Sequence, residues 1–185
     1  MTQIQILTFL KIIKMNRIKY FFALIFLILV SNGYSQIKYS IRSEIGFLKF
    51  QNNTVQVDPG PNWEGYNLND ENGIDINIVN GVAFNNKVFV GIGFGYLNFE
   101  AIDGVSLFTD FEYLPLKTKL TPLINLKIGY SHLWNQYENG TGTGLGELCL
   151  GLNYRLTEKI NIYTKSGFLM TQQSLLIPIR LGIRF

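Results

Sequence analysis

Large apolar and small or charged residues alternate along the last twelve positions of the chain, Ser174–Phe185. From Leu175 the odd positions all carry large apolar side chains, whereas the even positions include Arg180, Gly182 and Arg184. A period of two is the period of a β-strand, in which successive side chains point to opposite faces. One face is too uniformly bulky for a water-exposed surface and the other carries fixed charge. The pattern therefore predicts a strand that lies between lipid and a polar interior.

The same alternation recurs along the chain between segments of turn-forming residues, and no amphipathic helix of useful length is predicted between the strands. The eight predicted strands are Ile37–Phe50, Ile74–Asn85, Lys87–Phe99, Val105–Leu114, Thr121–Trp134, Gly144–Leu156, Ile160–Met170 and Ser174–Phe185. An even number of strands can close into an antiparallel barrel without free edges. In lipid such closure is required, because each unpaired backbone group costs several kcal/mol. The sequence therefore predicts an all-β fold, an eight-stranded antiparallel up-and-down transmembrane β-barrel.

Charged residues gather on one face of these strands, which we predict to be the inner face. They are Lys38, Arg42, Glu44, Asp75, Asp110, Glu112, Lys127, Glu147, Arg155, Lys165, Arg180 and Arg184. A charge at the lipid midplane costs about 2–4 kcal/mol, which favours this segregation. Eight strands leave an interior just wide enough for side chains to fill, and charges inside it must pair. We therefore expect a plugged polar core with no wide aqueous pore.

The connections between the predicted strands differ in length, as they do at the two ends of an outer-membrane barrel. Long or medium polar connections are predicted on the outer side at Gln51–Gly73, Asn98–Gly104 and Asn135–Thr143. Short connections are predicted on the inner side at Asn85–Asn86, Pro115–Leu120 and Thr157–Lys159. Transmembrane barrels have short periplasmic turns and longer extracellular loops. The final outer connection, near Thr171–Ser174, is short and is the one misfit. The pattern as a whole favours a barrel whose mature N-terminus lies in the periplasm.

Aromatic residues are predicted near both ends of the strands. Tyr96, Phe99, Tyr130 and Trp134 lie near the outer ends, and Phe84, Phe111, Tyr113, Tyr154 and Phe185 near the inner ends. Two girdles of aromatic side chains at headgroup level are typical of membrane barrels. A water-soluble barrel would instead place its bulky residues inside and its polar residues outside, so the sequence favours the membrane form.

The N-terminal segment has the parts of a secretory signal peptide. Basic residues up to Lys19 precede an unbroken apolar run, Tyr20–Val30, and small polar residues follow. We predict cleavage after Ser35. An uncleaved anchor is disfavoured because the run is shorter than the roughly 20 residues of a spanning helix. The predicted organisation is a signal peptide at residues 1–35 (15–35 forming a complete signal, 1–14 a possible upstream extension) and an outer-membrane barrel domain at residues 36–185.

Composition excludes several other classes of function. The net charge is +3, and no cluster of Lys and Arg exists that would follow a phosphate backbone, which argues against nucleic-acid binding. Cys149 is the single cysteine, so no internal disulfide or cysteine-based metal site can form. We expect a buried, inert thiol at this position.

Three segments resemble a known family. The stretch FTDFEYLPLKTKLTPLINLKIGYSH, Phe108–His132, resembles the middle hairpin of small porin-like outer-membrane barrels of Bacteroidetes-type bacteria, which have OmpA/OmpX-type eight-stranded folds. Exported members often mature at a junction like Ser35–Gln36, and Gly182–Phe185 resembles the C-terminal signal read by the barrel assembly machinery. The resemblance implies location in the cell outer membrane and contact with its lipid and lipopolysaccharide, but no defined role. Pro178 departs from the pattern and predicts a bulge in the last strand.

The candidate chemistry is weak. Asp110, Glu112 and Glu147 could act as paired carboxylates in acid–base catalysis, but we favour an interior ion network. The basic members of that network are predicted to be Arg155, Arg180, Arg184 and Lys127. His132, the single histidine, has Ser131 beside it, yet neighbouring strand residues point to opposite faces and cannot form a nucleophile–base pair. We therefore assign no catalytic, cofactor-binding or metal-binding residue and expect no enzyme activity.

The predicted outer loop Gln51–Gly73 is acidic and aromatic, so it could bind a surface ligand or be a solvated loop. The favoured function is a structural or surface-interaction role for a monomeric porin-like barrel. Passage of small or hydrophobic solutes is the alternative, and a lipid-modifying enzyme that uses His132 is a third.

Overall fold

The computed structural model describes residues 37–54, 71–100, 102–134, 141–171 and 174–185. The chain divides into two compact units, Met1–Ile37 and Lys38–Phe185, and the second unit is described below. The predicted signal peptide and most of the predicted loop at 51–73 lie outside the described residues. Within the described part, no helix has the length and apolar character needed to cross a membrane.

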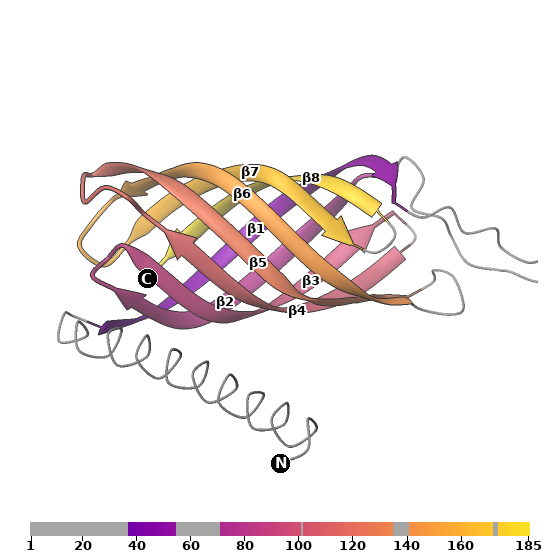
Figure 1. The fold of residues 1–185 in the computed structure, drawn as a ribbon, viewed down its shortest axis with the longest axis horizontal. Coiled ribbons are helices and arrows are strands. Elements are labelled where there is room, and N and C mark those ends of the chain that lie inside the picture. Colours follow the sequence, from indigo (N-terminus) through magenta and orange to yellow (C-terminus); the bar gives the residue numbers. More distant parts are fainter. Residues whose placement is uncertain (1–36, 55–70, 101, 135–140, 172–173) are drawn as a thin grey trace, which may run out of the picture. The chain divides into compact units, whose positions relative to one another are not determined.

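Eight antiparallel strands close into a single barrel, with each strand paired to its neighbours in sequence and β1 paired to β8 (Figure 1). The strands are β1 Ile37–Asn53, β2 Gly73–Phe84, β3 Val88–Phe99, β4 Ile102–Tyr113, β5 Leu120–Leu133, β6 Thr141–Arg155, β7 Asn161–Thr171 and β8 Ser174–Arg184. The predicted fold class is thus confirmed, and every predicted strand is present with its ends shifted by a few residues. The strands are strongly tilted, as closure of an eight-stranded barrel requires.

Side chains alternate between the two faces as the sequence pattern predicts. The exterior carries the large apolar residues; Ile92, Leu107 and Leu150, for example, are 64%, 60% and 65% exposed. Water does not stabilise an apolar belt of this kind, whereas hydrocarbon does, so this surface faces lipid. The predicted aromatic residues of the girdles are exposed as well, except Phe99, which is only 1% exposed. Phe99 has the same parity along β3 as the inward-facing Leu97, and its ring fills the interior.

Three short connections, 85–87, 114–119 and 156–160, lie with the C-terminus at one end of the barrel (Figure 1). The other end has two connections of two residues each but also the longest one, 54–72, so we assign the first end to the periplasm. The turn between β2 and β3 runs through Asn85 and Asn86, whose φ angles are 54° and 55°. Two central residues with positive φ define the turn type that matches the twist of a hairpin, and Asn tolerates that conformation. The Lys87 amide closes it by donating to the Phe84 carbonyl at 2.9 Å.

Two predictions about irregular segments are wrong. The connection Asn98–Gly104 is not a medium-length loop, because the ladder between β3 and β4 continues to the pair Phe99–Ile102. Only positions 100 and 101 separate these strands. Pro178 causes no bulge: the β7–β8 register is the same on both of its sides, from Ser166–Ile179 to Leu169–Leu176. The irregularity lies instead on β1, between Phe50 and Asn52.

Candidate functional site

The barrel interior has two kinds of filling at different heights, and the sequence predicted only one of them. Its outer part is apolar and includes Leu48, Leu97, Phe99, Ile102, Leu133, Leu145, Leu169 and Leu176, all buried in one cluster. The prediction of a uniformly polar core is therefore wrong for this part. Apolar residues at inward positions near the outer strand ends were the signal for it.

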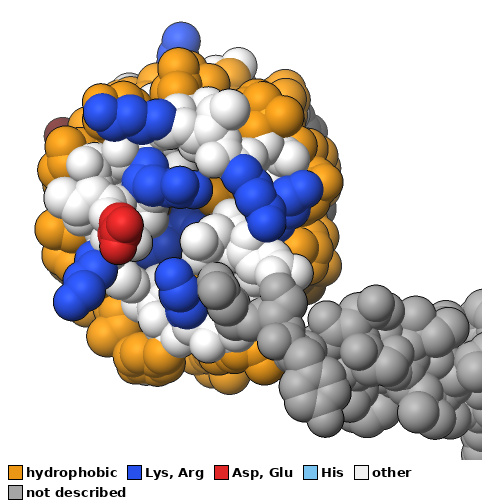
Figure 2. All heavy atoms as spheres, turned by 90° about the vertical axis from the view of Figure 1, so that its left-hand side faces the viewer, with side chains coloured by type: hydrophobic (Ala, Val, Ile, Leu, Met, Phe, Trp, Pro, Cys, Tyr) orange, Lys and Arg blue, Asp and Glu red, His pale blue; other side chains and the backbone are white. Residues whose placement is uncertain are grey.

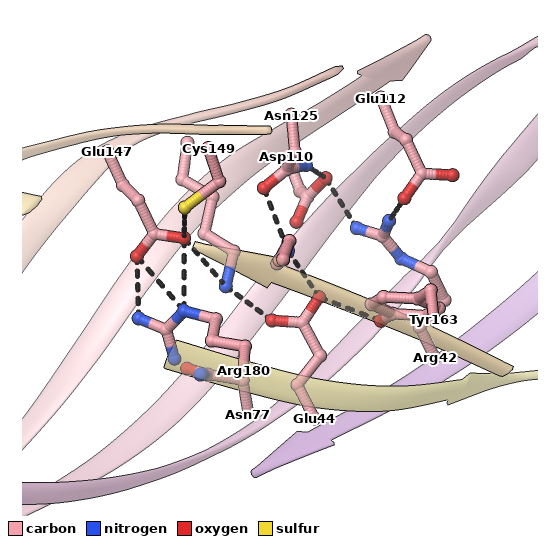
Figure 3. A network of polar contacts seen from close by, with 12 residues as sticks. Arg42, Glu44, Asn77, Asp110, Glu112, Asn125, Glu147, Cys149, Tyr163 and Arg180 are labelled. Atoms are coloured by element: carbon pink, nitrogen blue, oxygen red, sulfur yellow. Dashed lines mark hydrogen bonds and ion pairs between the residues drawn. The ribbon is translucent and has the colours of Figure 1, made fainter. Parts of the chain in front are cut away.

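Glu44 is the hub of the polar part of the interior, and its carboxylate binds three partners from β5 and β7 (Figure 3). One oxygen, Oε2, accepts a hydrogen bond from Lys127 Nζ at 2.6 Å. The other, Oε1, accepts bonds from Lys165 Nζ at 2.6 Å and from Tyr163 Oη at 2.8 Å. Lys165 also donates to Asn125 Oδ1 at 2.8 Å. One carboxylate therefore ties three strands together across the barrel.

Arg180 forms a second centre, which joins β8 to β2 and β6. Its guanidinium binds Glu147 in a fork, with Nε 3.0 Å from Oε1 and Nη2 2.5 Å from Oε2. Its third nitrogen, Nη1, pairs with Asp75. Lys127 Nζ lies 3.7 Å from Glu147 Oε1 and links this centre to Glu44. Bidentate Arg–carboxylate geometry combines charge with direction, which fixes both side chains.

Arg42 and Arg184 form the third centre, nearest the periplasmic end. Arg42 pairs with both Asp110 and Glu112, and Arg184 pairs with the other oxygen of Glu112. The Arg42 guanidinium also lies over the Phe89 ring, 4.1 Å from its centroid. This stacking on an aromatic face satisfies a side of the guanidinium that no carboxylate reaches.

The buried charges in the described part of the chain balance. The buried acids are Glu44, Asp75, Asp110, Glu112 and Glu147, and the buried bases are Arg42, Lys127, Lys165, Arg180 and Arg184, five of each. A charge inside a barrel is tolerated when it is paired and hydrogen-bonded. The predicted plug of ion pairs is thus present.

Glycines on the facing strands make room for these large side chains. At Gly46, a Cβ atom would collide with Asp75 and Arg180. At Gly182, it would collide with the ring of Tyr163, which packs across the strand pair. On β3, Gly93 leaves similar space for the ring of Phe108, and Gly95 leaves space for Asn77 and Ser106.

The carboxylates that could have formed a catalytic pair are bound within the ion network. Asp110, Glu112 and Glu147 are each bound to basic partners in the ion network. Arg155, which we expected in that network, lies beyond it at the periplasmic end. Cys149 is fully buried, and its Sγ lies 3.4 Å from Glu147 Oε1 as a donor.

Ser131 and His132 point to opposite faces, as predicted. Ser131 is buried inside, with its Oγ 3.2 Å from Thr143 Oγ1. His132 is on the outer face, where its ring meets Trp134 edge-on at a centroid distance of 5.3 Å. Among the described residues, no group of three His, Cys, Asp or Glu side chains is arranged to hold a metal ion.

The outer rim carries a small polar cluster that the sequence analysis did not identify. Asp103 Oδ1 accepts hydrogen bonds from Tyr96 Oη at 2.5 Å and from Asn98 Nδ2 at 2.7 Å. Glu71, two positions before β2, has a raised pKa because of partial burial and because of the negative charge of Glu100. These contacts order the ends of β3 and β4.

The periplasmic end holds a cavity of about 560 Å³. Its walls come from the start of β1, the three short turns and the C-terminus, and four of its side chains are basic: Lys38, Arg155, Lys159 and Arg184. We call this cavity the periplasmic vestibule. Figure 2 looks at this end and shows Lys and Arg side chains around a hollow. Glu158 is the acidic residue of the lining.

No known protein-family model matches the chain, and a search of curated proteins also finds no match. The structure is similar to solved outer-membrane barrels. Neisserial surface protein A aligns with a TM-score of 0.61 at 8% identity, over 81% of this chain and 98% of the other. The N-terminal β-barrel domain of Pseudomonas aeruginosa OprF aligns with a TM-score of 0.51 at 13% identity, over 81% of this chain and all of the other (100%).

Identities this low show a shared fold and nothing finer, so the resemblance to a family of Bacteroidetes-type bacteria stays a prediction. The fold and the lipid-facing belt agree with each other. The chain therefore has the architecture of small eight-stranded outer-membrane β-barrels and is a protein of the outer membrane.

Proposed function

We propose that this protein is a closed, non-enzymatic barrel of the porin-like class with a structural or surface-interaction role. The observation that carries the proposal is the filled interior. Ion pairs centred on Glu44, Arg180 and Arg42 cross the barrel at mid-height. The apolar cluster that includes Leu97 and Phe99 fills the interior beyond them. Two successive fillings of different chemistry leave a solute without a continuous polar path.

The absence of enzyme activity belongs to the same proposal. Each candidate carboxylate is neutralised by a basic partner, so it is unsuited to exchange protons with a substrate. His132 faces outward, and Ser131 faces inward. A lipid-modifying enzyme would need a nucleophile within hydrogen-bond reach of this histidine.

The partners follow from the same architecture. The exterior belt would contact outer-membrane lipid and lipopolysaccharide, and the C-terminal strand ending at Phe185 would be recognised by the barrel assembly machinery. A barrel closed by its own β1–β8 pairing does not need a second copy, which favours a monomer. Residues 51–73 are the proposed contact for a surface ligand.

A liposome-swelling assay tests the closed interior. The full chain, expressed with its export signal and purified from outer membranes, is reconstituted into liposomes, which are then placed in isotonic arabinose or glycine. We expect the same swelling rate as in protein-free liposomes. Swelling that increases with the amount of protein would refute the proposal and favour solute passage.

A further inference from the structure

The periplasmic vestibule has the features of a ligand site, and the proposed function does not use it. We propose that it binds a small organic anion that has an apolar body and a carboxylate or phosphate group. The inference goes beyond the role proposed above and shares with it only the closed interior, so a silent barrel that binds no anion would refute the inference and leave that role standing.

The size and walls of the vestibule suit a small molecule. Its volume of about 560 Å³ lies within the range of about 300–1,000 Å³ that is typical of small-molecule sites. Apolar side chains, including Leu114, Leu116 and Ile160, form part of the lining. Mostly apolar walls with a few polar groups are the usual composition of such sites, since the walls supply affinity and the polar groups supply orientation.

The charge of the lining sets the sign of the ligand. Lys38, Arg155 and Lys159 line the vestibule outside the ion network, and Glu158 is the acidic residue of the lining. The interior charges already balance among themselves, so they do not neutralise this excess. Basic groups around a hollow with low-dielectric walls concentrate anions there, and Figure 2 shows this ring of basic side chains.

The deeper lining also has unused hydrogen-bonding capacity. Arg184 is bound to Glu112 through Nη2, but its Nε is buried without a hydrogen-bond partner. Buried polar atoms without partners are rare in folded proteins and call for an explanation. Arg184 Nε is an N–H donor, so an oxygen of a bound anion would match it once the side chain shifts to open Nε to the vestibule.

The vestibule does not continue through the barrel, and this distinguishes a binding site from the mouth of a channel. Arg184 belongs both to its lining and to the ion network with Glu112 and Arg42. Beyond these pairs, Lys127 and Lys165 are held by Glu44. An anion attracted to the vestibule therefore reaches a closed floor and stays bound there.

The test uses the full chain purified from outer membranes and placed in phosphatidylcholine nanodiscs. The probe is 1-naphthyl phosphate, and the matched control is 1-naphthylmethylammonium, which has the same rings and the opposite charge. Amide NMR shifts of Leu116, Arg155 and Phe185 report on the vestibule, and those of Trp134 report on the opposite end. We expect saturable shifts at the vestibule with the phosphate alone.

Charge-removing variants show whether binding depends on the vestibule itself. The double variant Lys38→Gln/Arg155→Gln should weaken probe binding by about tenfold or more, because two facing cations are lost. The matched pair Lys87→Gln/Lys117→Gln removes the same charge from turns outside the lining and should change binding less than about twofold. Lys159→Gln, at an exposed turn position, should give an intermediate loss and serves if the double variant does not fold.

A change of lipid identifies the source of the anion. If phosphatidylglycerol in the nanodisc shifts the vestibule amides by itself and weakens probe binding, the natural ligand is a phospholipid headgroup. If it does neither, a soluble anion is the ligand, and both results support the proposal. The proposal is wrong if the vestibule amides do not respond, if the ammonium control shifts them equally, or if both double variants weaken binding to the same extent.

Discussion

Replacing Glu44 with glutamine should destabilise the barrel strongly, because this carboxylate is the hub of the ion network. Glu44→Gln keeps the size of the side chain and removes its charge. Lys127 and Lys165, both fully buried, would then face a neutral amide instead of a carboxylate oxygen at 2.6 Å. The hydrogen bond from Tyr163 would also weaken, since it now ends on an anionic oxygen at 2.8 Å.

The size of the effect follows from these contacts. Removing one partner of a buried ion pair costs about 3–5 kcal/mol, because an uncompensated charge remains. Two ammonium groups lose their nearest anion here, yet each keeps one contact. Lys127 Nζ lies 3.7 Å from Glu147 Oε1, and Lys165 Nζ donates to Asn125 Oδ1 at 2.8 Å. We therefore expect the free energy of unfolding to fall by about 3–5 kcal/mol. Urea unfolding in phosphatidylcholine vesicles, followed by the mobility of unheated samples in gels, measures this loss.

A second substitution shows whether the loss comes from charge. In Glu44→Gln/Lys165→Met, four acids face four bases, so part of the lost stability should return. The double-mutant cycle should give a coupling energy of about 1–3 kcal/mol between Glu44 and Lys165. If Glu44→Gln costs less than about 1 kcal/mol, or if the coupling is zero, water reaches Glu44 and the argument for a filled interior fails.

Two further predictions concern packing and titration. Gly182→Ala should lower the free energy of unfolding by about 1–3 kcal/mol in the same urea assay, because the added methyl group would overlap the ring of Tyr163. Gly146→Ala, whose methyl group would meet nothing within 4 Å, is the control and should be nearly neutral. Equal losses in the two variants would contradict the packing. The Glu71 carboxyl should titrate above its ordinary pKa in ¹³C NMR, and Glu100→Gln should lower that pKa by removing a negative neighbour. A carboxyl with a raised folded-state pKa favours the protonated folded state, so its contribution to stability should decrease as pH rises through that pKa. A Glu71 pKa that is unchanged in Glu100→Gln would refute the contribution of Glu100 to the shift.

The strands and their two faces could be predicted from the sequence because one physical constraint acts at every position. A strand between lipid and a packed interior has to alternate, and the alternation in Ser174–Phe185 does so without exception on its apolar face. The turn at Asn85–Asn86 was predicted because two turn-forming residues separate two such alternating segments. Alternation could also have placed Phe99 inside, since Phe99 follows the inward Leu97 at a spacing of two.

The turn-forming residues of Asn98–Gly104 led to a wrong prediction of a loop, because cross-strand pairing continues through them. Asp103–Gly104 is a typical turn dipeptide, yet both residues lie in β4 and pair with Asn98 and Leu97 of β3. In lipid each unpaired backbone group is costly, so the ladder extends through residues with weak strand propensity. Cross-strand pairing of this kind is not visible in a single segment.

The partners within the interior could not be predicted either. The sequence assigns a residue to the inner face, but height in the barrel depends on strand tilt and stagger. Arg155 and Arg184 both face inward, yet Arg184 reaches Glu112 and Arg155 lies in the vestibule. The vestibule itself is built from turns and strand ends far apart in the sequence, so no local pattern indicates it.

Single-channel recording in planar bilayers tests the central claim most directly. The full chain, purified from outer membranes, is inserted and recorded in about 1 M KCl, where screening of the mouth charges is strong. The faster mobility of unheated samples in gels shows that the purified barrel is folded. A barrel filled by the Glu44 network and by the apolar cluster around Phe99 should remain silent in the bilayer. Steady, ion-selective openings by the folded protein would contradict the filled interior.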